Sequence, residues 1–173
     1  MRLDELFDTP LNWEVVLDES DDFHAQFEVG EYIYTVGAHE IINSKASKEF
    51  DGSPSYWEFG FDQWIPSMKK KAQDKHGSIY RKEWKKHENI TGTGNAATVY
   101  STVAEILQHF LKTKKPKLFR FSAKLDEPSK QKLYRVFSQK AAKKYTKTYE
   151  LDTTIGKDFH GKKAEIYWFT RKK

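Results

Sequence analysis

An amphipathic helix between two apolar strands constrains the fold of this chain most. Residues 96–111 place apolar side chains three and four positions apart, which is the spacing of one buried helix face about four turns long. A strand is predicted before this helix, at 56–64, and another after it, at 118–123. Two strands joined through a helix in one sheet run parallel. The sequence therefore predicts an α/β fold around this unit.

The remaining segments add further strands and a second helix. Strands are expected at 13–19, 23–30, 32–41, 145–151 and 164–170, loops at 42–54 and 155–163, and a helix that starts at Pro128 with Asp126 or Glu127 as its cap. The expected order is β-β-β-β-α-β-α-β-β, which gives a mixed sheet with helices packed on it. A length of 173 residues suits a single domain, with a basic surface insertion at 65–88.

Composition excludes several classes of site. The chain has no cysteine, so disulfides, thiolate catalysis and zinc–thiolate sites are excluded. Its six histidines lack the spacing of known zinc motifs, and we expect no bound metal. No apolar run reaches the roughly 20 residues that a membrane helix needs, and no signal peptide is evident. We therefore expect a cytoplasmic protein that does not bind membranes.

Charge is distributed unevenly along the chain. Residues 1–63 carry 15 acidic and 3 basic side chains, whereas residues 64–173 carry 10 acidic and 27 basic side chains. One interpretation is that the two halves neutralise each other within one fold. The other is a basic surface for an anionic partner.

The segment 89-NITGTGNA-96 stands between the predicted strand and the helix. Glycine allows a close backbone approach to a ligand, and the first N–H groups of a helix have no intrahelical acceptor. The segment therefore suits an anion such as a phosphate. It lacks the Lys-Ser/Thr ending of a P-loop. A helix cap that uses glycine only for its geometry is the alternative.

The order of elements and this loop resemble the GNAT-type N-acetyltransferase superfamily. In that superfamily a loop of pattern R/Q-x-x-G-x-G/A wraps the pyrophosphate of acetyl-CoA, and this chain has 89-NITGTG-94, with Asn in place of Gln or Arg. A later helix ends its motif in Leu-Tyr, as 129-SKQKLY-134 does here. Over residues 56–150 the chain is similar to acetyltransferase-like proteins of tailed bacteriophages.

The resemblance implies an acyl-CoA-dependent N-acetyltransferase that acts on a small-molecule or protein amine. It implies that Tyr134 protonates the departing thiolate, although a core-packing role for this ring is the alternative. The implied acetyl-CoA-binding residues are Asn89, Thr91, Gly92, Thr93, Gly94, Asn95, Ala96 and Ser129.

Glu58 is the candidate general base for the amine. It lies on the strand before the glycine loop and shares a strand face with Asp62. A carboxylate at this position can accept a proton through water if its pKa is suitable. The alternative is that both residues belong to a solvated sheet face.

A second function remains open, in which the fold serves as a non-catalytic binding protein. The basic segment mixes cations with aromatic rings, which suits phosphate contacts and base stacking. The candidate nucleic-acid residues are Lys69, Lys70, Lys71, Lys75, Arg81, Lys82, Trp84, Lys85 and Lys86. A host or virion protein is the other partner expected for such a surface, and virion packaging is the other location considered.

Overall fold

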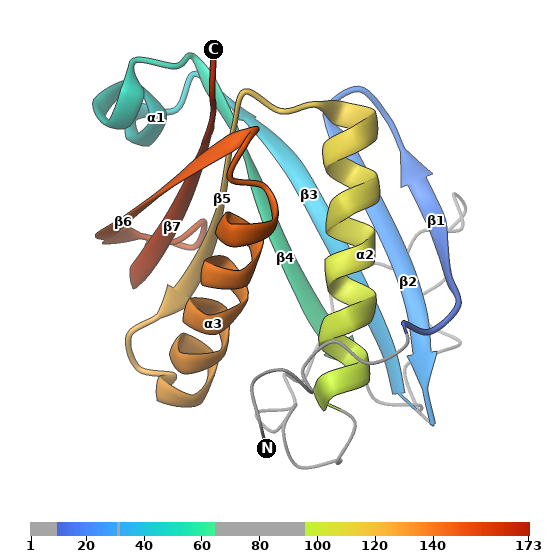
Figure 1. Ribbon diagram of the computed structural model, residues 1–173. Helices are drawn as coiled ribbons and strands as arrows, with labels where there is room; N and C mark the ends of the chain where they lie inside the picture. Colours follow the sequence, from blue (N-terminus) through green and yellow to red (C-terminus); the bar gives the residue numbers. More distant parts are fainter. Residues whose placement is uncertain (1–9, 31, 65–95) are drawn as a thin grey trace. The chain divides into compact units, whose positions relative to one another are not determined.

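The computed structural model describes residues 10–30, 32–64 and 96–173 (Figure 1). Its strands are β1 (Trp13–Asp18), β2 (Asp22–Val29), β3 (Tyr32–Ile42), β4 (Ser55–Trp64), β5 (Leu118–Lys124), β6 (Tyr149–Lys157) and β7 (Lys163–Arg171), and its helices are α1 (Lys45–Asp51), α2 (Ala96–Lys114) and α3 (Pro128–Lys144). The strands form one mixed sheet in the order β1-β2-β3-β4-β5-β7-β6. The predicted α/β class with a mixed sheet is confirmed.

Contacts divide the chain into two compact units. The first consists of Met1–Ala38 and Phe61–Lys114, and the second consists of His39–Gly60 and Lys115–Lys173. Strands β3 and β4 each contribute residues to both units. The expectation of a single domain stays a prediction.

In the first unit, α2 packs against the β1–β2 hairpin. The rings of Phe23 and Phe110 lie 5.6 Å apart, and the indole nitrogen of Trp13 donates a hydrogen bond to Glu105 at 2.9 Å. The amphipathic pattern of α2 explains this contact, because its apolar stripe is buried while its last turn carries Lys112 and Lys114. The helix ends at Lys114, two residues before Pro116.

In the second unit, β5 pairs antiparallel with β7 along its whole length. Strand β4 pairs parallel with β5, with Trp57 opposite Phe119 and Glu58 opposite Arg120. This pairing confirms the predicted parallel strands on either side of α2. Because side chains alternate across a strand, β5 and β7 present one set of residues to α3 and the other set to α1.

The face of β5 and β7 toward α3 is built from aromatic rings. The ring of Phe121 lies edge-on to Phe137 of α3 at 5.4 Å and to Phe169 of β7 at 5.6 Å. Phe119 stacks on Phe169 at 4.7 Å. Edge-to-face and offset pairs of this kind are favourable beyond the area that they bury. They fix α3 on this face of the sheet.

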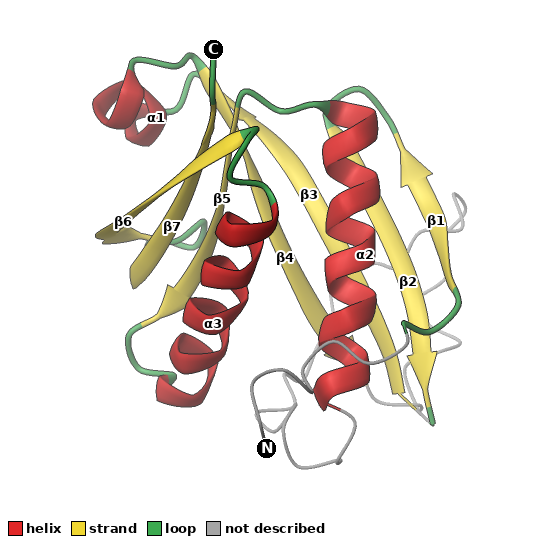
Figure 2. Ribbon diagram, viewed as in Figure 1, coloured by secondary structure: helices red, strands yellow, loops and turns green. Residues whose placement is uncertain are grey.

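Helix α1 replaces part of the loop expected at 42–54, and that expectation was wrong (Figure 2). The Ser44 hydroxyl caps the helix by accepting from the N–H of Ser47, and Gly52 ends it in the left-handed conformation at φ 77°. Packing supplies the rest of its stability, since Phe50 stacks on Trp168 at 4.7 Å. The observed order is therefore β-β-β-α-β-α-β-α-β-β, with one helix more than expected.

Strand β6 begins later than predicted. Residues 145–148 form turns after α3 rather than a strand, because the N–H groups of Tyr145 and Tyr149 bond back to the carbonyls of Ala141 and Tyr145. The strand then continues to Lys157, into the segment expected as a loop. Pro128 does start α3, although Glu127 at the cap makes no side-chain hydrogen bond to the helix.

Within the described ranges, none of the helices combines the length and the apolar character required to cross a bilayer.

Candidate functional site

Most of the predicted ligand-binding residues fall outside the described residues. This applies to Asn89, Thr91, Gly92, Thr93, Gly94 and Asn95, and to every candidate nucleic-acid residue between Lys69 and Lys86. Ala96 is the first residue of α2, and Ser129 is the second residue of α3. Their assignment to a cofactor site stays a prediction.

The first turn of α2 presents backbone N–H donors. Its first turn carries no acidic side chain, and its N–H groups have no acceptor within the helix. The hydroxyls of Ser101 and Thr102 both donate to the carbonyl of Thr98, at 2.9 and 2.8 Å. Those hydroxyls are therefore engaged within the helix, and the backbone N–H groups form the donor set. Such a set fits a phosphate or pyrophosphate.

Glu58 accepts hydrogen bonds at both carboxylate oxygens. The Nε group of Arg120 donates to one oxygen, and the hydroxyl of Ser122 donates to the other at 2.6 Å. Both partners lie on β5, the parallel neighbour of β4. The carboxylate is only 14% exposed, so Glu58 is not a solvated surface residue. It holds an ion pair across two strands.

Arg120 is the most deeply buried charge of this group, at 3% exposure. The carbon at the centre of its guanidinium lies 4.4 Å from the ring centre of Tyr56 and 4.9 Å from that of Trp168. These aromatic faces stabilise the cation where water is excluded. Burial raises the pKa of the Tyr56 hydroxyl, while the positive charge of Arg120 opposes the rise. The guanidinium therefore has one carboxylate and two aromatic rings as its partners.

Tyr134 lies on α3 and contacts the aromatic face of the sheet. Its ring is tilted against that of Phe121, with 6.4 Å between the ring centres, and the residue is half-buried. The packing contact expected for this ring is present. A role for its hydroxyl in proton transfer stays a prediction.

The two predicted catalytic residues lie on opposite sides of the sheet. Glu58 shares the side of Arg120, Tyr56 and Trp168, where Phe50 of α1 packs. Tyr134 contacts Phe121, which belongs to the other set of alternating residues on β5. The structure therefore does not bring the candidate base and the candidate acid together on one face.

A second charged group lies next to Tyr134 in sequence. Arg135 donates from Nη2 to both carboxylate oxygens of Glu165 on β7, at 3.2 and 3.1 Å. The hydrogen bonds to Glu165 raise the pKa of Arg135 further. Burial, and then Glu165, raises the pKa of Tyr167 to about 12. Tyr167 therefore stays neutral, and Arg135 stays charged, across the physiological range.

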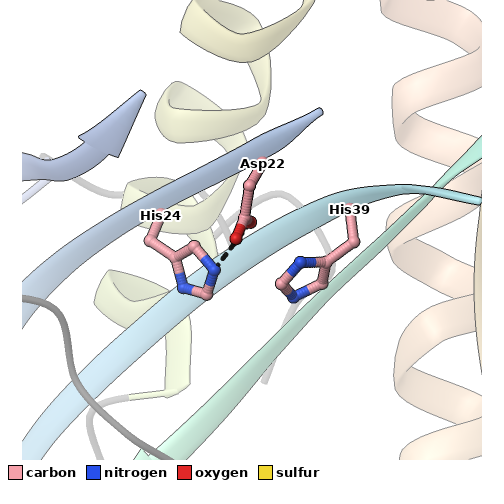
Figure 3. A group of neighbouring side chains, drawn as sticks. All are labelled: Asp22, His24 and His39. Carbon is pink, nitrogen blue, oxygen red and sulfur yellow. Dashed lines mark ion pairs between the residues drawn. The ribbon is translucent and has the colours of Figure 1, made fainter. Parts of the chain in front are cut away.

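In the first unit, Asp22 and His24 form a pair on β2 (Figure 3). They are two residues apart, so both side chains leave the same face of the strand. The Nε2 atom of His24 lies 2.8 Å from a carboxylate oxygen of Asp22. Figure 3 also draws His39 of β3, another side chain able to ligate a metal ion, which belongs to the second unit. The expectation that the chain binds no metal stays a prediction.

The partnership of Glu58 with Arg120 and Ser122 was not predicted from the sequence. One signal was present in 118-LFRFSA-123, where an arginine stands between two phenylalanines of a strand expected to be buried. A buried charge requires a partner of opposite sign. The identity of that partner depends on strand register, which a single sequence does not determine.

No protein-family model matches this chain, and no curated protein matches it in sequence.

Proposed function

We propose that this chain is a GNAT-type N-acetyltransferase that transfers an acetyl group from acetyl-CoA to an amine. The observation that carries the proposal is the parallel pairing of β4 with β5, the two strands that precede and follow α2 in the chain. Cα partners are Trp57 with Phe119 and Glu58 with Arg120, although β4 continues to Trp64 and β5 to Lys124.

The order of the sheet supports the same proposal. Strand β5 lies between parallel β4 and antiparallel β7, and β6 forms the edge. The glycine segment 89–94 precedes α2, as the pyrophosphate loop does in the family that the sequence resembles. The first-turn N–H groups of α2 would hold the pyrophosphate, since no acidic side chain opposes it there.

When bound, acetyl-CoA supplies a thioester whose carbonyl carbon bonds to the acceptor nitrogen as the carbon–sulfur bond breaks. The acceptor amine must be neutral, and the departing sulfur needs a proton. In this proposal the Tyr134 hydroxyl gives that proton, the acceptor nitrogen loses one proton to water, and water returns a proton to Tyr134. Glu58 has both oxygens occupied by Arg120 and Ser122, so it serves to hold β4 against β5. A base role for Glu58 stays a prediction that its hydrogen bonds do not favour.

Binding of acetyl-CoA is the direct test. A functional site should raise the thermal midpoint, because a ligand at about 100 times its Kd stabilises the native state by about 2.7 kcal/mol. S-acetylpantetheine, which lacks the pyrophosphate, should produce a much smaller rise. No rise with acetyl-CoA at millimolar concentration would contradict the proposal.

Catalysis is measured separately, as the release of free CoA thiol from acetyl-CoA in the presence of a panel of amines. The chain contains no cysteine, so a thiol-reactive chromogen reports only the CoA that is released. Binding without release for any amine favours the alternative of a non-catalytic protein with this fold. Nucleic-acid binding that weakens steeply with salt would favour the basic segment as the functional surface.

A further inference from the structure

Strand β6 forms an edge of the sheet and is unusually open. It is last in the strand order, and four consecutive residues, 152–155, are exposed on both of its faces. Ile155 is 59% exposed. In the described part of the chain, no strand pairs with the outer edge of β6. An exposed edge of this length is a template for another strand.

The hydrogen bonds of the β6–β7 hairpin show which backbone groups face outward. The N–H of Asp158 donates to the carbonyl of Lys162, and the N–H of Lys172 donates to the carbonyl of Thr148, both at 2.8 Å. Along an antiparallel strand, residues whose N–H and C=O groups bond to the neighbouring strand alternate with residues whose groups point away from it. The even-numbered residues of β6 therefore turn their N–H and C=O groups toward β7. The odd-numbered residues turn theirs outward.

Leu151, Thr153 and Ile155 thus present donors and acceptors along the open edge. The N–H of Tyr149, the next odd residue, is already bonded to the carbonyl of Tyr145. Natural edge strands are commonly protected by lysine, proline or a bulge. The stretch 151-LDTTIG-156 contains neither lysine nor proline, and its register with β7 runs without a bulge. The centre of this edge is unprotected.

We propose that β6 is a self-association surface, on which two copies of the chain pair their β6 strands antiparallel about a two-fold axis through Thr153. The sheet then continues from one copy into the other. Leu151, Thr153 and Ile155 of each copy exchange about six backbone hydrogen bonds with the second copy.

Side chains select this register. In this register Thr153 lies opposite Thr153 of the second copy. Leu151 of each copy then lies opposite Ile155 of the other, so the exposed side chain of Ile155 gains an apolar neighbour. Asp152 then lies opposite Thr154, and no like charges meet. Moving the two-fold axis from Thr153 to Thr154 would place Glu150 of one copy opposite Asp158 of the other. Like charges directly opposite are destabilising.

Sedimentation over a concentration series tests the association. The chain has a mass of 20.3 kDa, and we expect a concentration-dependent species of twice that mass. Ile155→Lys should weaken the association by about tenfold or more, as edge lysines do. Thr153→Pro should do the same, because it removes an outward N–H and spares the ladder with β7. Ile42→Lys is the matched control, since Ile42 is 62% exposed on β3 and should tolerate the change.

The register is tested by cysteine pairs in a chain that has no cysteine. In the proposed dimer, residues 152 and 154 of different copies face each other at about 4.5 Å between Cα atoms, within disulfide range. A mixture of Asp152→Cys and Thr154→Cys should therefore form a mixed disulfide dimer on mild oxidation. Either variant alone should not.

Three outcomes would overturn the proposal. The first is a wild-type chain that stays monomeric to millimolar concentration. The second is an association that Ile155→Lys and Thr153→Pro leave unchanged while both variants keep wild-type circular dichroism, or that Ile42→Lys weakens equally. The third is a dimer whose cysteine variants cross-link as readily alone as in the mixture.

Discussion

Glu58 and Arg120 form an ion pair across the two parallel strands β4 and β5, at the point where their residues are in register. The pair is nearly excluded from water, and Tyr56 and Trp168 flank the cation. A buried pair of this kind matters most when one partner is lost, because the other charge is then left uncompensated.

Replacing Arg120 should therefore destabilise the protein strongly. We expect Arg120→Met to lower the free energy of unfolding by about 3–5 kcal/mol, since it leaves the buried carboxylate of Glu58 without its cation. The double variant with Glu58→Gln should recover part of this loss. Urea denaturation measures both. Equal stability of the single and double variants would contradict the uncompensated charge that we expect at Glu58 in Arg120→Met.

Tyr134→Phe separates proton transfer from packing. The variant keeps the ring against Phe121, so the thermal midpoint should change little. If the hydroxyl protonates the thiolate, kcat should fall by about 10²–10⁴-fold with a small change in KM. Tyr145→Phe, at the end of the same helix, is the control and should leave kcat unchanged. A wild-type kcat in Tyr134→Phe would assign the residue to packing alone.

Stability should fall in alkali because buried tyrosines, among them Tyr34 and Tyr149, hold their protons in the folded state. Burial raises the pKa of Tyr34 and of Tyr149 to about 12. In the unfolded chain a tyrosine loses its proton near pH 10, so above that pH the folded state binds more protons than the unfolded state. This contribution is complete below about pH 10 and is lost as the pH rises toward about 12.

Thermal unfolding between about pH 9 and about pH 12 measures this effect. Tyr34→Phe should make the decline shallower, because Tyr34 is fully buried and its ionisation is removed. A decline of the same slope in wild type and in Tyr34→Phe would place the alkaline sensitivity elsewhere.

Gly52→Ala should destabilise α1 through the backbone alone. Gly52 has a φ of 77°, and a Cβ atom there would meet no other atom within 4 Å. The expected loss is about 1 kcal/mol, from forcing alanine into the left-handed region. Gly60→Ala is the control, since its added Cβ is equally free and its φ is not positive. Chemical denaturation of both variants should show a loss only for Gly52→Ala.

The sequence predicted the elements whose periodicity is long and regular. Helix α2 followed from the spacing of its apolar residues, and the start of α3 followed from Pro128 at the first helical position. Helix α1 was missed because its seven residues are too few to show a period, although Ser44 and Gly52 supply its two caps. Strand β6 was placed too early because 145-YTKTYEL-151 reads as a strand, whereas the end of α3 takes up its first residues in turns.

The candidate site was less accessible to sequence reasoning. Alternation along β4 places Glu58 and Tyr56 on one face, and both side chains contact Arg120. It did not reveal Arg120 as the partner, because the two residues are 62 positions apart and meet only through register. Glu58 and Tyr134 lie on opposite sides of the sheet because β4 pairs with β5 and α3 packs on the other face of β5. Such tertiary contacts cannot be read from a single sequence.

The junction of β4 and β5 also has a consequence for how the chain folds. Bringing Glu58 to Arg120 closes a loop of 62 residues, whereas β6 and β7 are joined by a short turn. Local hairpins form in microseconds, and distant pairings wait for loop closure, so the parallel junction should assemble late. Refolding should therefore form the hairpin of β6 and β7 before it forms the contact of Glu58 with Arg120.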